Sequence, residues 1–329
     1  SNCTSLVYTI MKFFFSWVSL VVAVGAIANP IEYNGQGQVI RVAPEVDIFG
    51  ITSSLAKPEP VPDPVPMYEQ FAGIAQQVNC RKHKIGMKVG DAELLWSNGD
   101  DDLDQRVQIY LSKMVGLTVA WAGQNVSSLN SILTGATFPM KPADFELFPF
   151  ARKGSMISIG IQDAYKRVAN QVLHKIQHFQ EKYNEDRVSF TGLSLGAMIS
   201  SLAMVHVQHN LKRGCIYRSV VFGFPRVGNV QWANTIDEQM KGKFFYVENG
   251  NDIVPHIPPR VLGFHFPSGQ IWIKKANSTH WMFYPGQENV HGSNSEWGFS
   301  VPDHTGVYFN TEIGSYWGHC PATVGKDGK

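Results

Sequence analysis

The chain has 329 residues, of which 44% are hydrophobic and 17% are charged, and its formal net charge is +1. This length and apolar content suit one large globular domain, or at most two. A charge so close to zero gives no reason to expect nucleic acid or a strongly anionic membrane surface as a partner.

A short basic start and an apolar run come first in the chain. Residues 11–28, MKFFFSWVSLVVAVGAIA, end in the small-residue pattern Ala26-Ile27-Ala28. This is typical of a secretory signal peptide that is cleaved after its last alanine, whereas a membrane anchor would need a longer apolar run. We therefore expect residues 1–28 to comprise a few upstream residues and a signal peptide, and the protein to be secreted and extracellular.

Residues 29–66 are predicted to be a pro-segment or an N-terminal arm. The tract from Lys57 to Pro66, KPEPVPDPVP, should hold a polyproline-like conformation. The spacing of apolar residues in the next stretch, MYEQFAGIAQQVNC, is helical. We therefore expect residues 67–325 to form one catalytic domain.

Four cysteines are present: Cys3, Cys80, Cys215 and Cys320. Cleavage of the signal would remove Cys3, so one pair and one free thiol are expected in an oxidising compartment. Cys80 and Cys320 lie near the two ends of the predicted domain, so a bridge between them would close a long loop and constrain the unfolded chain strongly. Cys215 begins an apolar stretch and is expected to be a buried free thiol, although the sequence leaves the pairing open.

Strands and helices are predicted to alternate along the rest of the chain. We expect strands at 106–110, 116–122, 188–191, 217–225, 243–248 and 269–275, and helices at 165–183, 195–209 and 231–240. Residues 127–138, SSLNSILTGATF, are amphipathic and are expected to form one to three helical turns. This order is typical of an α/β fold whose central sheet is mostly parallel and flanked by helices.

The pentapeptide Gly192-Leu193-Ser194-Leu195-Gly196 lies between a predicted strand and a predicted helix. A chain that turns directly from strand to helix forces the corner residue into an unfavourable region of φ and ψ, and small neighbours are needed to avoid clashes. The corner side chain then stands at a helix N-terminus, where developing negative charge is stabilised. This context identifies a nucleophile elbow with Ser194 as the candidate nucleophile.

A serine hydroxyl needs a base within hydrogen-bonding reach and an acid that orients the base. In this type of fold the acid follows the serine in sequence and the histidine comes last. Asp252 directly follows an apolar strand and is the candidate acid, in competition with Asp237, Glu238 and Glu248. His304 lies in a turn near the C-terminus and is the candidate base; the competitors are His256, His265, His280, His291 and His319.

Acyl transfer also requires hydrogen-bond donors for the oxyanion. The backbone N–H of Leu195, the residue after the nucleophile, is one candidate. The second is expected from the loop after an early strand, where Gly123 and Gln124 lie.

Several of these stretches resemble the secreted fungal class 3 lipases, an α/β-hydrolase family related to feruloyl esterases. The resemblance covers most of residues 67–325. The stretches that carry it are 119–124, VAWAGQ, 127–138, SSLNSILTGATF, 157–165, ISIGIQDAY, 221–229, VFGFPRVGN, 252–259, DIVPHIPP, and Asp303-His304. It implies that Ser194, Asp252 and His304 form a catalytic triad and that Leu195 and Gln124 form the oxyanion hole.

The resemblance also implies a lid over an apolar acyl groove. The candidate lid residues are Ser127, Ser128, Leu129, Asn130, Ser131, Ile132 and Leu133. An ordinary surface helix is the alternative interpretation. The chain departs from the family's pattern at Leu193, where the family usually has His, and at Gln124, where it usually has Ser or Thr.

The sequence therefore predicts a secreted serine hydrolase of carboxylic esters, most similar to lipases that act on acylglycerols. A feruloyl or short-chain esterase is the nearest alternative, and a non-catalytic lipid-binding relative is the alternative from another class. We expect no cofactor, because no His, Cys or carboxylate group has metal-ligand spacing. The expected partners are a lipid or ester substrate and an oil–water or lipid interface, with no nucleic acid, and the protein is expected to be a monomer.

Overall fold

The computed structural model describes residues 53–99, 105–123, 138–296, 300–314 and 320–325, together with the backbone of strands β1 (Glu32–Tyr33) and β2 (Val39–Arg41). The chain divides into two units, residues Ser1–Ser53 and Ser54–Lys329. In the first unit, β1 and β2 pair as antiparallel strands. The helices of the described residues and the remaining strands belong to the second unit.

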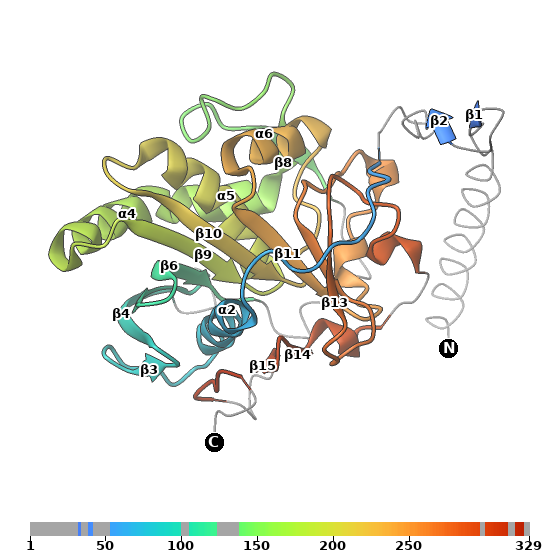
Figure 1. Cartoon of the computed structure of the whole chain (residues 1–329). Coiled ribbons are helices and arrows are strands. Elements are labelled where there is room, and N and C mark those ends of the chain that lie inside the picture. Colours follow the sequence, from blue (N-terminus) through green and yellow to red (C-terminus); the bar gives the residue numbers. More distant parts are fainter. Residues whose placement is uncertain are drawn as a thin grey trace, which may run out of the picture. The chain divides into compact units, whose positions relative to one another are not determined.

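A nine-stranded sheet is the centre of the part of this unit that the structure describes (Figure 1). Its order is β13-β12-β11-β10-β9-β6-β5-β4-β3, and the five strands from β12 to β6 are parallel, whereas both margins are antiparallel. The strands are β3 (Lys88–Val89), β4 (Ala92–Asn98), β5 (Val107–Ser112), β6 (Gly116–Trp121), β9 (Arg187–Gly192), β10 (Cys215–Phe222), β11 (Phe244–Asn249), β12 (Gln270–Ile273) and β13 (Trp281–Tyr284).

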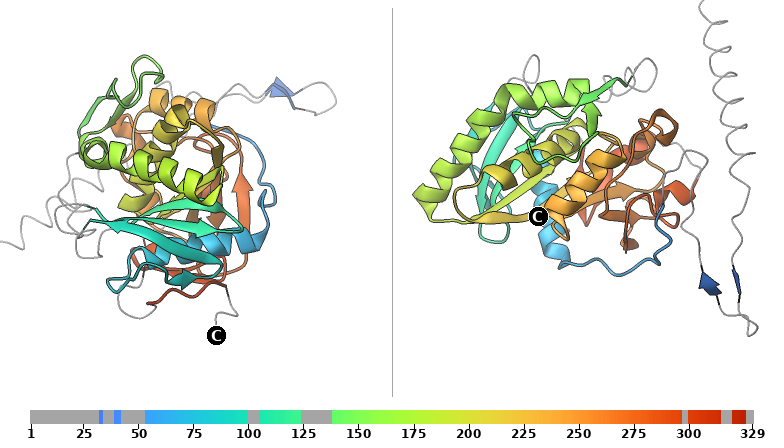
Figure 2. Two further views of the ribbon diagram at one scale, coloured as in Figure 1. Left: turned by 90° about the vertical axis from the view of Figure 1, so that its left-hand side faces the viewer. Right: turned by 90° about the horizontal axis from the view of Figure 1, so that it is seen from above.

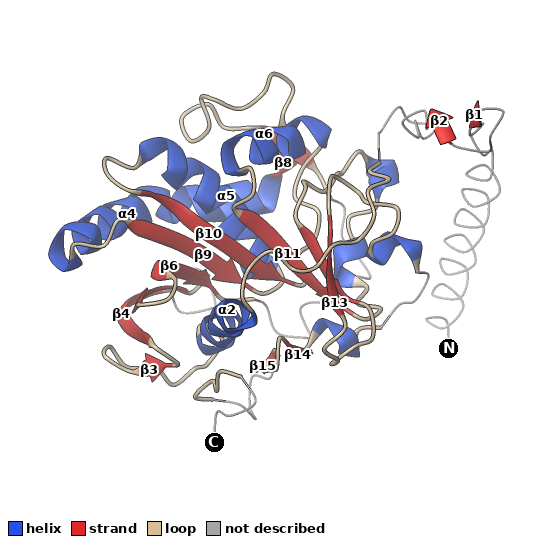
Figure 3. Cartoon of the chain, in the orientation of Figure 1, coloured by secondary structure: helices blue, strands red, loops and turns tan. Residues whose placement is uncertain are grey.

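Helices cover both faces of the sheet. Helices α4 (Ile159–Tyr183), α5 (Leu195–Asn210) and α6 (Val230–Met240) lie on one face and α2 (Val65–Gln77) lies on the other (Figures 2 and 3). Successive side chains of a strand point to opposite faces, so Val221 of β10 packs in the core under α4 and α5 while Val220 and Phe222 pack with α2. The expected mostly parallel sheet flanked by helices is confirmed.

Smaller elements complete the unit. Strands β7 (Met140–Pro142) and β8 (Met156–Ser158) pair with each other, as do β14 (Gly306–Tyr308) and β15 (Thr311–Ile313). Single helical turns are η1 (Val254–His256), η2 (Arg260–Leu262), η3 (Ser293–Ser295) and η4 (Pro302–His304). None of the helices in the described ranges is long and apolar enough to cross a membrane.

The Pro-rich tract belongs to the compact unit that starts at Ser54. Glu59 has proline on both sides but keeps its own N–H, and it pairs in both directions with Phe283 of the edge strand β13 at 2.8 Å. Asp63 accepts two hydrogen bonds of 2.9 Å from Arg218. Helix α2 then begins at Val65, because proline is tolerated in the first turn of a helix. The expected boundary at Met67 therefore falls inside a helix.

Three other expectations need correction. Helix α4 begins at Ile159, six residues before the expected start, because tertiary hydrogen bonds such as Ile159 N to Pro139 O (3.0 Å) fix a first turn that contains a glycine. No strand was predicted between residues 81 and 105, but β3 and β4 lie there and form the antiparallel margin of the sheet. Cys215 is exposed, because it begins β10 at the end where the strand leaves the core.

Candidate active site

The corner between β9 and α5 is strained at Ser194. This residue has φ 59° and ψ −121°, a conformation that side-chain-bearing residues rarely adopt, and it is 2% exposed. Its backbone N–H donates to Phe222 O at 3.0 Å, and its own carbonyl accepts from Ala197 and Met198 at 3.0 and 3.1 Å. These bonds at the start of α5 and across to β10 hold the strained corner in place.

The two glycines of the pentapeptide are required by close packing. A Cβ on Gly192 would lie 2.6 Å from the carbonyl of Gly196, and a Cβ on Gly196 would lie 2.2 Å from Trp121 O. Both distances are far below van der Waals contact, and both involve backbone atoms that cannot move aside. The elbow therefore needs glycine at both ends so that α5 can approach β6 and β9.

Asp252 and His304 come together although 52 residues separate them. Asp252 follows the end of β11 and is 2% exposed, and His304 is the last residue of η4 and is 1% exposed. Asp252 Oδ2 lies 2.7 Å from His304 Nδ1, and Asp252 Oδ1 accepts from Val254 N at 2.9 Å. A buried carboxylate that accepts at Nδ1 leaves Nε2 as the ring nitrogen that can take up a proton.

His304 Nε2 is buried and has no hydrogen-bond partner among the described residues. A buried polar atom without a partner needs an explanation. A role as a base, which takes up a proton during the reaction, would explain this nitrogen. The arrangement can therefore accept a proton at Nε2 while Asp252 holds the ring.

Gly223 joins the elbow to the imidazole. A Cβ on this glycine would lie 2.5 Å from His304 Cε1 and 3.4 Å from Asp252 Oδ2. The preceding residue, Phe222, accepts the hydrogen bond from Ser194 N. The end of β10 therefore contacts all three candidate residues. Sequence reasoning missed this role, although Gly223 lies inside the quoted motif VFGFPRVGN.

The loop after β6 lies against the elbow. A Cβ on Gly123 would lie 2.8 Å from Leu193 O and 3.6 Å from the Ser194 Cβ. The backbone N–H of Gly123 donates to Asn79 Oδ1 at 2.8 Å, so this N–H is already engaged. Leu195 is the first residue of α5, and N–H groups of a first helical turn have no intrahelical acceptor. Gln124 and the candidate lid residues 127–133 lie outside the described residues.

A buried ion pair supports the segment that follows Asp252. Arg226 donates to both carboxylate oxygens of Glu288 at 2.7 and 2.9 Å and to the carbonyls of Pro255 and Pro258 at 3.1 and 3.4 Å. Burial by itself raises the pKa of Glu288, but the Arg226 charge outweighs it and holds that pKa at about 2. Sequence reasoning missed this pair, although Arg226 lies inside the motif VFGFPRVGN.

The competing candidate acids and bases have other surroundings in the structure. Asp237 of α6 accepts from Ser268, and burial raises its pKa. Glu248 is buried in β11. Burial lowers the pKa of His256 to about 4, and His265 Nδ1 lies 4.0 Å from Glu288 Oε1. His280 and His291 make no contact with the Asp252–His304 pair in the described structure, and His319 lies outside the described residues.

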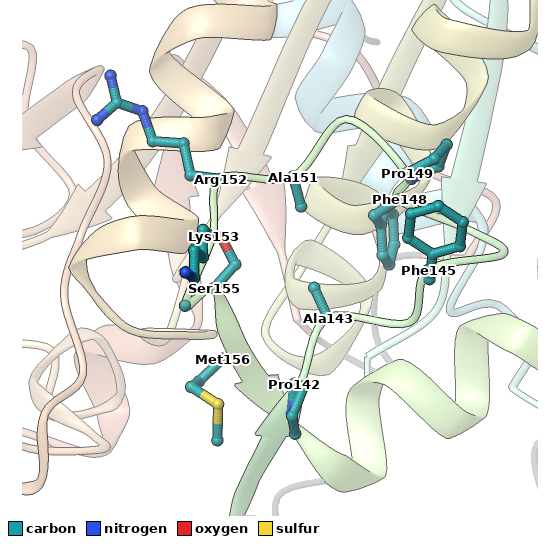
Figure 4. A pocket seen from close by; sticks show the side chains of 11 residues that line it. Pro142, Ala143, Phe145, Phe148, Pro149, Ala151, Arg152, Lys153, Ser155 and Met156 are labelled. Atoms are coloured by element: carbon teal, nitrogen blue, oxygen red, sulfur yellow. The ribbon is translucent and has the colours of Figure 1, made fainter.

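Two further features contain none of the three candidate triad residues. A hollow of about 370 Å³ is lined by residues between Pro142 and Met156, with Phe145 at 78% exposure on its rim (Figure 4). Cys80 and Cys320 form a disulfide that joins the end of α2 to the C-terminal segment. In the described ranges no group of three His, Cys, Asp or Glu side chains could hold a metal ion.

Comparisons with known proteins agree with this geometry. The family described as "Lipase (class 3)" matches residues 118–262. The secreted mono- and diacylglycerol lipase LIP2 of Malassezia restricta is 59% identical over 290 residues, which cover 88% of this chain and 92% of that protein. The secreted mono- and diacylglycerol lipase MDL5 of Malassezia globosa is 57% identical over 290 residues, 88% of this chain and 93% of that protein.

Solved structures of fungal lipases have the same fold. A lipase from Rhizopus microsporus var. chinensis aligns with a TM-score of 0.65 at 26% identity, covering 81% of this chain and 98% of that one. The Lip2 lipase of Yarrowia lipolytica aligns with a TM-score of 0.66 at 19% identity, covering 79% of this chain and 98% of that one. The chain therefore belongs to the class 3 lipase family, and it is a secreted carboxylic-ester hydrolase with the α/β-hydrolase fold.

Proposed function

We propose that this enzyme hydrolyses mono- and diacylglycerols through an acyl-enzyme on Ser194. The observation that carries the proposal is the buried pair of Asp252 and His304. This pair packs on Gly223, and the residue before it, Phe222, accepts the hydrogen bond from the Ser194 N–H. The similarity to relatives that are named mono- and diacylglycerol lipases supports the substrate class.

In the proposed reaction, Ser194 Oγ attacks the ester carbonyl while His304 Nε2 takes the serine proton. Asp252 orients the ring and stabilises the imidazolium that forms. His304 then returns the proton to the departing glycerol oxygen, which leaves an acyl-serine. Water then attacks the acyl-serine while His304 takes its proton, and the return of that proton to Ser194 Oγ releases the fatty acid. Each half-reaction develops one negative charge on the carbonyl oxygen, and the backbone N–H groups of Leu195 and Gln124 stabilise it.

The remaining assignments belong to the same proposal. Residues 127–133 act as a lid that covers an apolar acyl groove in water and moves aside at a lipid interface. Cleavage after Ala28 releases the signal peptide, and the tract from Ser54 to Pro66 stays part of the catalytic domain because of its pairing with β13. The enzyme works as a monomer and has no nucleic-acid partner.

The test is a substrate series with Ser194→Ala beside the unaltered enzyme. Mono-, di- and triacylglycerol emulsions of one acyl chain, and short-chain and feruloyl esters in solution, are hydrolysed in a pH-stat. We expect hydrolysis of mono- and diacylglycerols, a rise in rate where the substrate forms an interface, and no activity for Ser194→Ala. Ser201→Ala removes a buried hydroxyl from the same helix and is the matched control, with activity close to that of the unaltered enzyme.

Two outcomes would contradict the proposal. Short-chain ester hydrolysis that survives in Ser194→Ala would rule out this serine as nucleophile. A preference for dissolved aryl esters over every acylglycerol emulsion would leave the serine in its role and replace the lipase by an esterase.

A further inference from the structure

The turn that carries His304 is joined to the segment that carries Asp252 by hydrogen bonds of the neighbouring residue Asp303. Asp303 Oδ2 accepts from Asn251 N at 2.8 Å, and Asp303 O accepts from Asn249 Nδ2 at 3.1 Å. Each contact joins a residue next to the candidate base with a residue close before the candidate acid. The two segments are thus held together by bonds between side chains and backbone groups as well as by the Asp252–His304 contact.

Asn249 is the centre of these contacts. It is the last residue of β11 and is fully buried. Its Oδ1 accepts from Asn277 N at 3.0 Å, and Asn277 Oδ1 accepts from Val307 N at 2.7 Å. One buried amide therefore links the end of β11, the turn before β13, and the chain on both sides of His304.

Gly250 shows how closely the two segments approach. It has φ 53°, and a Cβ there would lie 2.4 Å from Asp303 Oδ2 and 2.6 Å from Ala276 Cβ. The Asp303 carboxylate therefore occupies the space that a side chain at position 250 would need. Residues 249–252, Asn-Gly-Asn-Asp, therefore do more than turn the chain. They contact Asp303 in the turn that carries His304.

We propose that Asn249 and Asp303 are positioning residues, which hold the His304 turn so that the imidazole stays aligned between Asp252 and Ser194. This rests on the proposed function of the triad. The physical reason is that His304 sits on a single helical turn, η4, whose own hydrogen bonds are few. Without outside support the ring would shift relative to Ser194, and a misplacement of about 1 Å costs a catalytic step up to about 100-fold.

The test compares Asp303→Ala with Asp303→Asn. The alanine removes the acceptor for Asn251 N, whereas the asparagine keeps an acceptor oxygen of the same reach. We expect kcat on a soluble butyrate ester to fall roughly 10- to 100-fold in Asp303→Ala, with KM changed less than about twofold. Asp303→Asn should recover kcat to within about threefold of the unaltered enzyme. Asp186→Ala is the matched control, because it removes an exposed carboxylate that pairs with Arg213 at the start of β9.

Two more variants probe the same contact from the other side. Asn249→Ala removes the buried amide, and Gly250→Ala removes no hydrogen-bonding group but pushes a methyl group against the Asp303 carboxylate. Both should lower kcat in the same way as Asp303→Ala. All assays are run well below the Tm of each variant, and rates are expressed per mole of folded enzyme, so that a loss of stability is counted separately.

Three results would overturn the inference. The first is a kcat per folded enzyme within about twofold of normal in Asp303→Ala. The second is an equal loss in Asp303→Asn and Asp303→Ala, since the contact would then not be the cause. The third is a rise in KM that accounts for the whole effect. Ser194→Ala separates this inference from the proposed function: an inactive Ser194→Ala beside a fully active Asp303→Ala refutes only the positioning role.

Discussion

Glu248 offers a test of the electrostatics beneath the site. It lies in β11, four residues before Asp252, and is 1% exposed. Its Oε2 accepts from Gln270 Nε2 at 3.0 Å, and its Oε1 has no hydrogen-bond partner among the described residues. Burial raises the pKa of this carboxyl to about 8, against the opposing effects of Ser293 and Arg226. The side chain is therefore neutral in the folded protein at pH 7.

The sign of its effect on stability follows from the two states. In the unfolded chain the carboxyl loses its proton near the ordinary value of 4.5, whereas the folded protein keeps the proton until about pH 8. Between these values the folded state binds one more proton, so its stability falls by about 1.4 kcal/mol for each pH unit. The contribution is complete below pH 4.5 and is lost as the pH rises, by about 5 kcal/mol at most by pH 8.

Glu248→Gln keeps the shape and the acceptor oxygen but cannot ionise. Guanidinium titrations measure the free energy of unfolding of both proteins. As the pH rises from 5 to 8.5, the variant should become more stable than the unaltered enzyme by a few kcal/mol in total. Below pH 4.5, the gain should vanish. Glu238→Gln, which changes an exposed carboxylate, controls for the general effect of charge. Parallel curves for Glu248→Gln and the unaltered enzyme over this pH range would refute the reasoning.

Two more predictions concern the frame of the site. Replacement of Cys80 and Cys320 by serine removes a cross-link between residues 240 positions apart. The chain entropy of a loop of that length predicts a loss of about 5 kcal/mol in the free energy of unfolding. Denaturant unfolding with and without reductant measures this loss, and an unchanged midpoint would contradict it. Gly223→Ala places a methyl group against His304 Cε1 and should lower kcat roughly 100-fold. A soluble-ester assay checks this, and a kcat that remains normal would show that the contact does not constrain the imidazole.

The elbow could be predicted because its physics is local. Glycines at both ends of a short motif, a strand before it and a helix after it are all visible within about twenty residues, and the structure has the same three parts. The candidate roles of Asp252 and His304 rested on chain order and on the family resemblance. The structure adds their 2.7 Å contact, and their part in the reaction stays a prediction for the variants above.

Contacts between distant segments could not be predicted. Nothing in the composition of residues 54–66 says that Glu59 will find the edge of β13, because that edge is exposed only once the sheet exists. The exposure of Cys215 depends in the same way on where β10 leaves the core. The buried pair of Arg226 and Glu288 joins residues 62 positions apart, and neither residue by itself differs from a surface charge.

The sequence by itself determined the periodic and local features of this protein: the alternation of strands and helices, the elbow at Ser194, and the order in which an acid and a histidine follow it. The tertiary structure alone decided which residues support them. The contacts of Gly223 with the imidazole, of Asn79 with Gly123 in the loop after β6, and of Asn249 with Asp303 all depend on segments that meet only after folding. The physical reason is that periodicity reports which face of an element is buried, whereas hydrogen-bond partners are chosen by the packing of the whole chain.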